Sequence, residues 1–473
     1  MADEATGMTA REAARRIASG KWSSTDAVRA CLARIEARGR EVNAVVTLDG
    51  EGALRRAAEA DEVRARGGPL PPLHGVPFTV KDNIATAGIR TTASHPPLKD
   101  NVPDADATVV ARLKAAGAIL LGKTNLPELA MDFQTDSPLF GRSNNPHDPS
   151  RTTGGSSGGA AAAVASGMSF FDVGNDLLGS VRIPAHFCGT VGFVPGLGRV
   201  PRTGIVPRQS MGESVRQLPR IGFLARSVGD AALLASLSAG TDGQDMTAVP
   251  AVAAATPEAV PGLPGLRLLV TRDAGGVPAS RAVGAAFDAF VARLRAAGAS
   301  VREVPAGAFD FRLASLTFLR LFYPMIGSGM PSMVRFLAGR LGGMKFLDQN
   351  LGRYFKAEEA RRSLMESLDG LLADCDALLC PVTPTTAFPH VKPARRNGPM
   401  PVYTGGIDVD GKAVDYGTAT VGFTLPFSTT GSPVVVLPIG KSPEGLPIGI
   451  QIVGRRWGDA CLLAAAEAME AAR

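Results

Sequence analysis

The stretch TTGGSSGGA at residues 152–160 stands out in this chain for its glycine and serine content. It leads directly into AAAAVASG at 160–167, a run of small residues that predicts a helix packed close to its neighbours. A second Gly-Ser element, NDLLGSVRIPA, follows at 175–185. On composition alone, the Gly-Ser stretch is also typical of a flexible loop, or of a nest of backbone amides that holds an anion.

A lysine upstream favours a catalytic interpretation of these two elements. Lys81 ends the apolar stretch GVPFTVK within GVPFTVKDNI (75–84), which predicts a buried strand. A buried charge is costly unless it is partnered, and a desolvated lysine loses its proton more readily. Lys81 could then act as the general base that a serine nucleophile needs. The alternative is a lysine at a strand end that reaches solvent.

Other common catalytic motifs are absent from the sequence or lie in the wrong context. It contains no HExxH, so a zinc protease is not indicated, and its GxSxG spacing occurs inside the Gly-Ser stretch, which no predicted strand directly precedes, so a nucleophile elbow is not indicated. Its GxxxxGK[ST] match, GAILLGKT at 117–124, falls across the apolar stretch AILLGKTN (118–125) that predicts a strand, and not in a loop that opens a helix; with no convincing GxGxxG after a strand, this disfavours phosphate and dinucleotide chemistry. We therefore expect neither a cofactor nor a catalytic metal.

Composition indicates an ordinary globular protein, with 473 residues, 45% hydrophobic and 20% charged. The net charge of +6 is dispersed, with no block of like charges, which disfavours a nucleic-acid partner. The five cysteines form no CxxC, which favours reduced thiols and a cytoplasmic location. The N-terminus lacks the apolar region of a signal peptide, and no run of about 18 apolar residues predicts a membrane helix.

Strands and helices alternate along the chain, which predicts an α/β architecture. The stretch LRLLVT (266–271), a helix at about 280–297 and SVREV (300–304) indicate a βα-type unit, and PVVVLPIG (433–440) is expected to pair with LPIGIQIVG (446–454). Residues 246–265 are typical of a surface linker, and 311–346 are apolar and irregular. We expect a single domain over 1–473, with a core at about 60–245 and 375–470. Residues 246–374 would form a variable, partly helical region on the substrate side.

Five motifs in order resemble the amidase signature family, and the resemblance extends from about residue 8 to 470. They are LHGVPFTVKDNI (73–84), GAILLGKTNLPELA (117–130), FGRSNNPHDPSRTTGGSSGGAAAAVASG (140–167), GNDLLGSVRIPAHFCGTVGF (174–193) and GLPIGIQIVGRR (445–456). The resemblance implies a central mixed, twisted β-sheet covered by helices on both faces. It also implies a serine hydrolase that cleaves amide bonds without a cofactor.

The resemblance assigns roles to individual residues. Ser180 matches the acyl-forming nucleophile, Lys81 the general base, and Ser156 the serine that bridges them after a cis peptide bond. Ser157 is similar to a supporting serine. The oxyanion hole would be formed by the backbone N–H groups of Leu177, Leu178, Gly179 and Ser180.

Residues beside the nucleophile raise two further questions. Arg182 could clamp a substrate carboxylate, but we favour an Arg182–Asp176 pair that stiffens the loop. Leu178 stands where the family usually has glycine, and it would be strained if that position required a positive φ. Ser428 stands where many relatives have asparagine. Both departures bear on the substrate rather than on the reaction.

The substrate pocket is harder to derive. The resemblance places Ala130, Met131, Asp132 and Gly155 near the substrate. The apolar segment 311–346 either forms a wall on the leaving-group side or is ordinary core packing. An apolar wall would suit aryl or long aliphatic amides, nylon-type oligomers or carbamates.

Three functions compete. The first is a stand-alone amidase, monomeric or homodimeric, that acts on a small, largely apolar amide or a carbamate and has no nucleic-acid or membrane partner. The second is the glutaminase subunit of a tRNA-dependent amidotransferase, which predicts a basic clamp for the carboxylate of glutamine and a co-purifying partner. The variant 175–179 stretch and the long apolar 311–346 segment argue against it. The third is a non-catalytic binding protein on an amidase scaffold, against which intact Lys81, Ser156 and Ser180 argue.

Overall fold

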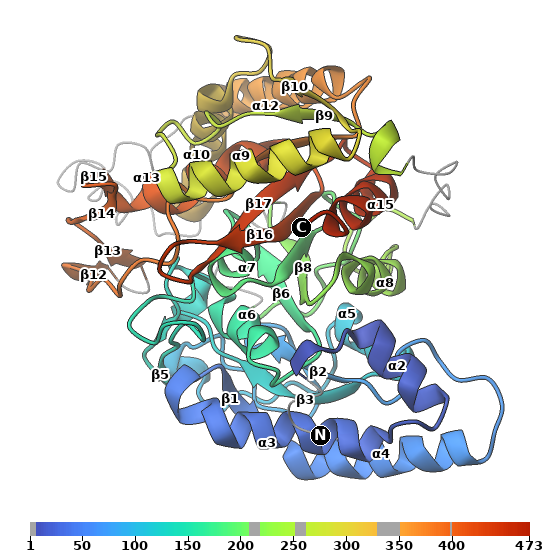
Figure 1. The fold of residues 1–473 in the computed structure, drawn as a ribbon. Coiled ribbons are helices and arrows are strands. Elements are labelled where there is room, and N and C mark those ends of the chain that lie inside the picture. The colour runs from blue at the N-terminus through green and yellow to red at the C-terminus, as the bar shows by residue number, and fades with distance from the viewer. Residues whose placement is uncertain (1–5, 208–217, 251–261, 329–350, 398–399) are drawn as a thin grey trace.

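A mixed β-sheet of eleven strands runs through the computed structural model of the chain (Figure 1). The structure describes residues 6–207, 218–250, 262–328, 351–397 and 400–473. From one edge of the sheet to the other, the strands are β1 (Val45–Leu48), β3 (Ile119–Thr124), β2 (Pro77–Lys81), β6 (Asp172–Asp176), β8 (Arg220–Ala225), β7 (Val191–Val194), β16 (Val434–Lys441), β17 (Pro447–Val453), β11 (Ala377–Pro381), β9 (Arg267–Val270) and β10 (Ser300–Glu303).

The sheet contains two parallel groups of three strands separated by antiparallel strands, and the edge strand β1 pairs antiparallel with β3. Strands β3, β2 and β6 are parallel, as are β11, β9 and β10, and the strands from β6 through β8, β7, β16 and β17 to β11 pair antiparallel. The predicted pairing of 433–440 with 446–454 is confirmed by β16 and β17, and the predicted βα-type unit by β9, α9 (Arg281–Ala296) and β10. At the parallel end, Lys81 lies opposite Thr124 of β3, and its strand neighbours β6 on the other side.

Helices surround this sheet, with α3 and α4 at one end of the view and α10 and α12 at the other (Figure 1). Beside α9, the described α-helices are α2 (Ala10–Ala18), α3 (Ser24–Val42), α4 (Gly50–Ala65), α5 (Thr108–Ala115), α6 (Gly158–Ala165), α7 (Arg182–Cys188), α8 (Val228–Ser238), α10 (Phe311–Ser328), α12 (Leu351–Leu371), α13 (Tyr416–Val421), α14 (Leu425–Thr430) and α15 (Asp459–Glu470). Short strands form three small sheets: β4 (Asp136–Ser137) with β5 (Gly141–Arg142), β12 (Arg395–Asn397) with β13 (Met400–Val402), and β14 (Gly406–Val409) with β15 (Lys412–Asp415).

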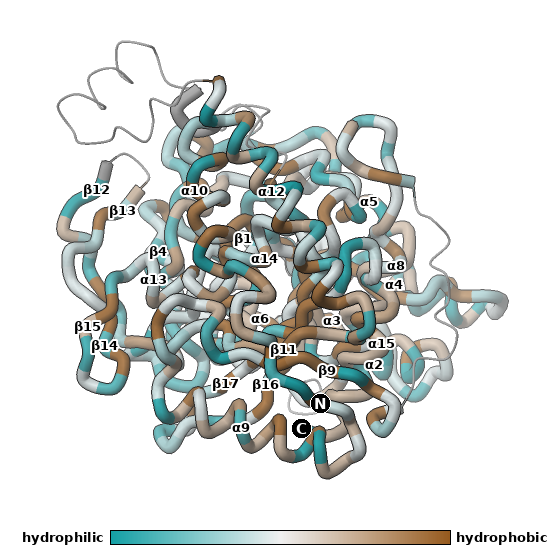
Figure 2. The backbone as a smooth tube through the Cα atoms, turned by 90° about the horizontal axis from the view of Figure 1, so that it is seen from above, coloured by the Kyte–Doolittle hydropathy of each residue, from teal (hydrophilic) through white to brown (hydrophobic). Residues whose placement is uncertain are grey.

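Both faces of the central sheet are covered, as expected. Successive side chains of a strand point to opposite faces. In β16, Val435 packs into a core cluster with residues of α8, α9 and α15, whereas Val436 packs into another cluster with residues of α6 and α7. Hydrophobic residues accordingly follow strands such as β9 and β11 through the molecule (Figure 2). The predicted α/β fold with helices on both faces is confirmed.

The small-residue helix predicted after the Gly-Ser stretch is α6. All of its residues except Ala165 are buried. A Cβ on Gly159 would overlap the backbone of Asn125 at the end of β3, so the first turn of the helix needs glycine there. This close approach holds the Gly-Ser turn, residues 154–157, beside the ends of β2 and β3.

One predicted segment differs from the structure. Residues 311–328 form the regular helix α10 rather than an irregular stretch, because Ala314, Phe318, Leu321 and Phe322 recur at helical spacing and are all buried. Pro324 lies within this helix, four residues before its last residue. The remainder of the predicted segment, and residues 251–261 of the predicted linker, lie outside the described residues. Among the described helices, none is long and apolar enough to cross a membrane.

Candidate active site

Lys81 lies at the end of β2 with its side chain completely buried. Its Nζ donates to Ser156 Oγ and to Asn175 Oδ1, each at 2.8 Å. Asn175 is on the neighbouring strand β6, and its own Nδ2 donates to Asn83 Oδ1 at 2.9 Å. Two of the three predicted catalytic side chains, Lys81 and Ser156, are therefore in direct contact, and the two asparagines that orient the lysine were not predicted.

Burial changes the chemistry of this lysine. It lowers the pKa of Lys81 from its ordinary value to about 7, and the charges of Asp176 and Asp172 oppose that change. A lysine with this pKa is largely neutral in weakly alkaline solution, and neutral lysine can accept a proton. The environment of Lys81 is therefore suited to a general base.

The Gly-Ser turn brings Ser156 to Lys81 and connects it to the second Gly-Ser element. The peptide bond between Gly155 and Ser156 is cis, which confirms the prediction from the resemblance. A Cβ on Gly155 would lie 2.8 Å from Asp132 O, so the neighbouring loop leaves no room for a side chain. The Ser157 N–H donates to the Ser180 carbonyl at 3.0 Å, and the Ser157 hydroxyl donates to the Asn175 carbonyl at 3.3 Å.

Ser180 lies in the short connection between β6 and α7, and is 6% exposed. The Asp176 carboxylate holds this connection, because it accepts from the Gly179 N–H at 2.8 Å and from the Val181 N–H at 3.0 Å. Since the Gly179 N–H is occupied in this way, we remove Gly179 from the predicted set of oxyanion donors. The left-handed φ of +132° falls on Gly179 and not on Leu178, so Leu178 is not strained.

Arg182 and Asp176 form a completely buried ion pair, as we favoured. Arg182 donates to both carboxylate oxygens, at 3.1 and 2.8 Å, and also to Thr424 O at 2.8 Å and to Ser428 Oγ at 2.7 Å. Despite its burial, the pKa of Asp176 falls to about 2, because the Arg182 charge and its hydrogen bonds favour the carboxylate. Arg182 is thus committed to the protein, and Ser428 is one of its partners.

Helix α14 and the turn before it support the nucleophile loop from a distant part of the chain. The Thr424 hydroxyl donates to the Leu178 carbonyl, while Arg182 reaches the carbonyl of the same threonine. These contacts join residues more than 240 positions apart in the sequence. No local pattern predicts them.

The predicted substrate loop, residues 130–132, lies against the Gly-Ser turn, but its carboxylate is already occupied. Asp132 accepts hydrogen bonds from the hydroxyls of Tyr403 and Tyr416, each at 2.7 Å, and the two tyrosine rings stack with centroids 3.9 Å apart. Ala130 has a left-handed φ of 60°, an uncommon conformation that clusters at functional sites. The places of Ala130 and Met131 in substrate binding stay predictions, and Asp132 anchors the tyrosines.

An apolar surface adjoins the nucleophile loop. Leu177, Leu178 and Phe133 are partly buried and pack against one cluster of buried hydrophobic residues. That cluster includes Phe318 and Phe322 of α10. The described part of the predicted wall segment therefore packs into the same cluster as the loop that carries Ser180. Within the described residues, no group of three His, Cys, Asp or Glu side chains is placed to hold a metal.

Comparisons with known proteins agree with this geometry. The family model described as Amidase matches residues 26–463. A glutamyl-tRNA(Gln) amidotransferase subunit from Moorella thermoacetica is 35% identical, with 98% of this chain and 96% of the relative covered; its counterpart from Koribacter versatilis is 33% identical, with 92% of each covered. The structure of 6-aminohexanoate cyclic dimer hydrolase complexed with substrate superposes with a TM-score of 0.82 at 28% identity, covering 99% of this chain and 97% of that one.

One prediction is wrong in the light of these relatives. We expected a small amide as the only partner and no nucleic acid. The curated relatives, however, are named as subunits of an amidotransferase for glutamyl-tRNA(Gln), so neither expectation stands. The family model matches nearly the whole chain, in agreement with the fold and with the sequence motifs. The chain therefore belongs to the amidase signature family.

Proposed function

We propose that the chain is a serine amidohydrolase in which Lys81 is the base, Ser156 the relay and Ser180 the nucleophile. The observation that carries this proposal is the 2.8 Å hydrogen bond between Lys81 Nζ and Ser156 Oγ, made by a completely buried lysine whose pKa is about 7. The bond from the Ser157 N–H to Ser180 O supports it, because it holds the second Gly-Ser element against the first.

The reaction begins when neutral Lys81 takes the proton of Ser156 and Ser156 takes the proton of Ser180. Ser180 Oγ then attacks the amide carbonyl and forms a tetrahedral oxyanion. We assign its stabilisation to the N–H groups of Leu177, Leu178 and Ser180, each worth about 3–4 kcal/mol in comparable sites. The proton returns through Ser156 to the departing amine, and water hydrolyses the acyl-enzyme.

For the substrate, we favour the amide of glutamine, hydrolysed by this chain as one subunit of a tRNA-dependent amidotransferase. Several curated relatives carry that name, at 33–35% identity over at least 92% of both chains. In such an assembly the ammonia released by this chain would be used by a partner. This proposal replaces the stand-alone amidase that the sequence alone favoured.

A small apolar amide is the second candidate, favoured by the surface beside Ser180. Leu177 and Leu178 present branched aliphatic side chains where the family usually has a smaller residue at the second position, and they pack against a hydrophobic cluster that includes aromatic residues of α10. Apolar lining with a few polar groups is usual for sites that take small molecules. Aryl amides, nylon-type oligomers and urethanes are the members of this class that we would test.

A substrate panel separates the two candidates. We would measure ammonia release from glutamine, by the chain alone and by the chain isolated with its native partners, beside p-nitroanilides, an aryl carbamate and the 6-aminohexanoate cyclic dimer, with Ser180→Ala as control. Glutamine turnover that requires co-purifying subunits supports the first candidate. Turnover of the apolar amides by the chain alone, without glutaminase activity in either preparation, supports the second. Equal rates for Ser180→Ala and the unmodified chain would refute both.

A further inference from the structure

A cavity of about 240 Å³ lies beside the end of α14, and no residue that lines it belongs to the candidate active site. Its walls come from the loop after β7, from α12, from the end of α14 and from the turn between β17 and α15. The residues that decide its chemistry are Leu197, Arg361, Met365, Thr430, Arg456 and Trp457.

The cavity holds a guanidinium group that protein contacts only partly satisfy. Arg361 is 8% exposed; its Nε donates to Thr429 O at 2.9 Å, and its ion pair with Glu358 is long, at 3.9 Å. In the part of the chain that the structure describes, these contacts leave the N–H groups on both terminal nitrogens of Arg361 without a hydrogen-bond acceptor. A guanidinium has five such donors in a planar fork, which matches a carboxylate.

The other charges at the cavity are already paired. Arg456 donates to Asp369 Oδ2 through Nε at 2.7 Å, and its second terminal nitrogen lies 2.6 Å from the same oxygen. The carboxylate of Asp459, near the Gly196 wall, accepts the Gly196 N–H at 2.7 Å and lies 3.5 Å from Arg199. Arg361 is therefore the group whose charge a ligand would complement.

The remaining wall is small and largely apolar, and the hydroxyls of Thr247 and Thr430 that also line the cavity donate to Asp245 Oδ1 and to Phe427 O. Leu197 and Met365 line it, and Trp457 stands at it with its side chain half exposed and its backbone in the left-handed region, at a φ of 64°. The volume is below the usual range of about 300–1,000 Å³ for drug-sized ligands. An aromatic or short aliphatic body would fit beside the indole, with its acid group on Arg361.

We propose that this cavity is a second ligand site, which binds a small monocarboxylate with an apolar or aromatic body. The site does not rest on the proposed amidase activity. The two sites are separate, although both contact the same short helix: Arg361 reaches the carbonyl of Thr429, and Arg182 reaches the hydroxyl of Ser428. Binding should therefore persist when the nucleophile is removed.

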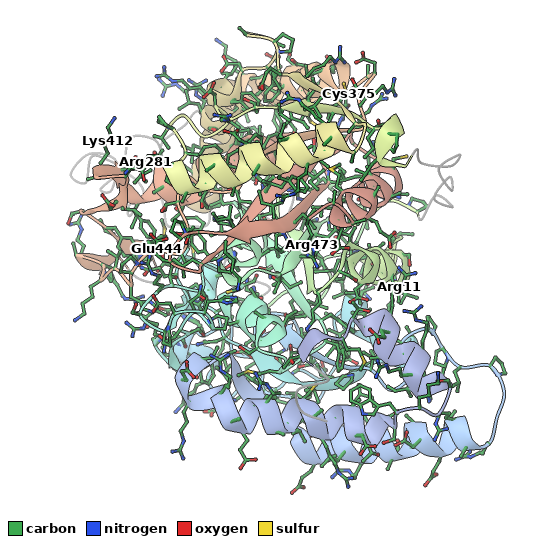
Figure 3. The ribbon with its side chains drawn as sticks, in the orientation of Figure 1. Arg11, Arg281, Cys375, Lys412, Glu444 and Arg473 are labelled. Carbon is green, nitrogen blue, oxygen red and sulfur yellow. The ribbon has the colours of Figure 1, made fainter. Side chains whose placement is uncertain are left out.

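The test is calorimetric titration of the full Ser180→Ala chain with benzoate and with hexanoate, beside benzyl alcohol as a neutral molecule of similar shape. We expect one carboxylate per chain and an affinity for benzoate at least about tenfold above that for benzyl alcohol, as charge-assisted hydrogen bonds would give. Arg361→Gln should remove this preference. Arg281→Gln, on the exposed surface of α9 near Lys412 (Figure 3), is the matched control and should leave it unchanged.

A second variant guards against misfolding of Arg361→Gln, because Arg361 also supports α14. Met365→Trp fills the cavity from α12 and leaves Arg361 in place, so it should abolish benzoate binding in a protein with an unchanged thermal unfolding temperature. Benzoate binding that survives both Arg361→Gln and Met365→Trp would overturn the proposal. Failure of benzoate and hexanoate to bind at millimolar concentration would overturn it as well.

Discussion

Acidification below pH 7 should switch off acylation by protonating Lys81. With a pKa of about 7, roughly half of Lys81 is neutral at pH 7, whereas an ordinary lysine with a pKa of 10.5 would be neutral in roughly one molecule in 3,000. Burial therefore raises the neutral fraction of Lys81 at pH 7 about a thousandfold. Because the protonated form cannot accept the Ser156 proton, kcat/KM should fall about tenfold for each pH unit below 7 and level off above it.

The acid limb is the fall of kcat/KM below pH 7. A variant that removes a negative charge near Lys81 tests whether protonation of Lys81 causes it. A carboxylate near an ammonium group stabilises the protonated form, so it raises the lysine pKa. Asp172 is buried on β6 and acts on Lys81 in this direction. Burial raises the pKa of Asp172 itself to about 7, so its charge is only partial near neutral pH and the expected change is small. Asp172→Asn should therefore move the acid limb of kcat/KM to lower pH. Asp230→Asn, which removes a buried carboxylate bound to the backbone of α2, should leave the limb in place.

The assay is the initial rate of amide hydrolysis between pH 5 and 9, in buffers of constant ionic strength. A rate that stays flat down to pH 5 would contradict a lysine base with a pKa near 7. So would an acid limb that Asp172→Asn moves to higher pH, because removal of a negative charge cannot strengthen the base.

Three further substitutions test the supports of the site. Arg182→Met should lower the free energy of unfolding by about 3–5 kcal/mol, since it leaves the carboxylate of Asp176 buried without its partner; thermal unfolding measures this. Tyr416→Phe removes one of the two hydroxyls that Asp132 accepts and should cost about 1–3 kcal/mol in a urea titration. Gly155→Ala should lower kcat/KM roughly 100-fold, because the added Cβ would lie 2.8 Å from Asp132 O and displace the Ser156 turn.

Each of these substitutions has a control elsewhere in the chain. Arg11→Met breaks an exposed ion pair with Glu467 and should cost about 1 kcal/mol or less. Tyr354→Phe removes a hydroxyl whose partner, Glu358, lies on the surface of α12. Gly284→Ala adds a methyl group where no atom lies within 4 Å. Effects of equal size in a substitution and its control would contradict the structural reason given for it.

The local parts of the site could be predicted from the sequence because their residues lie within short motifs. Lys81 at the end of an apolar strand and two nearby Gly-Ser elements indicated a candidate nucleophile site, and the resemblance of the motifs to the amidase signature family assigned the roles of base, relay and nucleophile. The Arg182–Asp176 pair was also foreseen, because the resemblance implies that the residues flanking the nucleophile serve structure. The strand pair β16–β17 was predicted correctly from two apolar runs separated by a turn.

The distant supports of the site could not be predicted. Tyr403 and Tyr416 reach Asp132 across more than 270 positions, and Thr424 reaches Leu178 across 246, so no spacing in the sequence relates them. Asp132 illustrates the consequence. The resemblance placed Asp132 near the substrate, but the fold supplies two hydroxyl donors that occupy its carboxylate. Short sequence motifs give even less information about the partners of the whole chain. The expectation of no nucleic-acid partner was wrong for that reason.

Covalent labelling of Ser180 tests the central claim most directly. A fluorophosphonate forms a stable adduct with an activated serine nucleophile, and mass spectrometry of the digested protein identifies the residue that carries it. We predict a single adduct on the peptide that contains Ser180, none in Ser180→Ala, and much slower labelling in Lys81→Ala and Ser156→Ala. An adduct on another residue of the active protein, or amide hydrolysis that Ser180→Ala retains in full, would contradict the account.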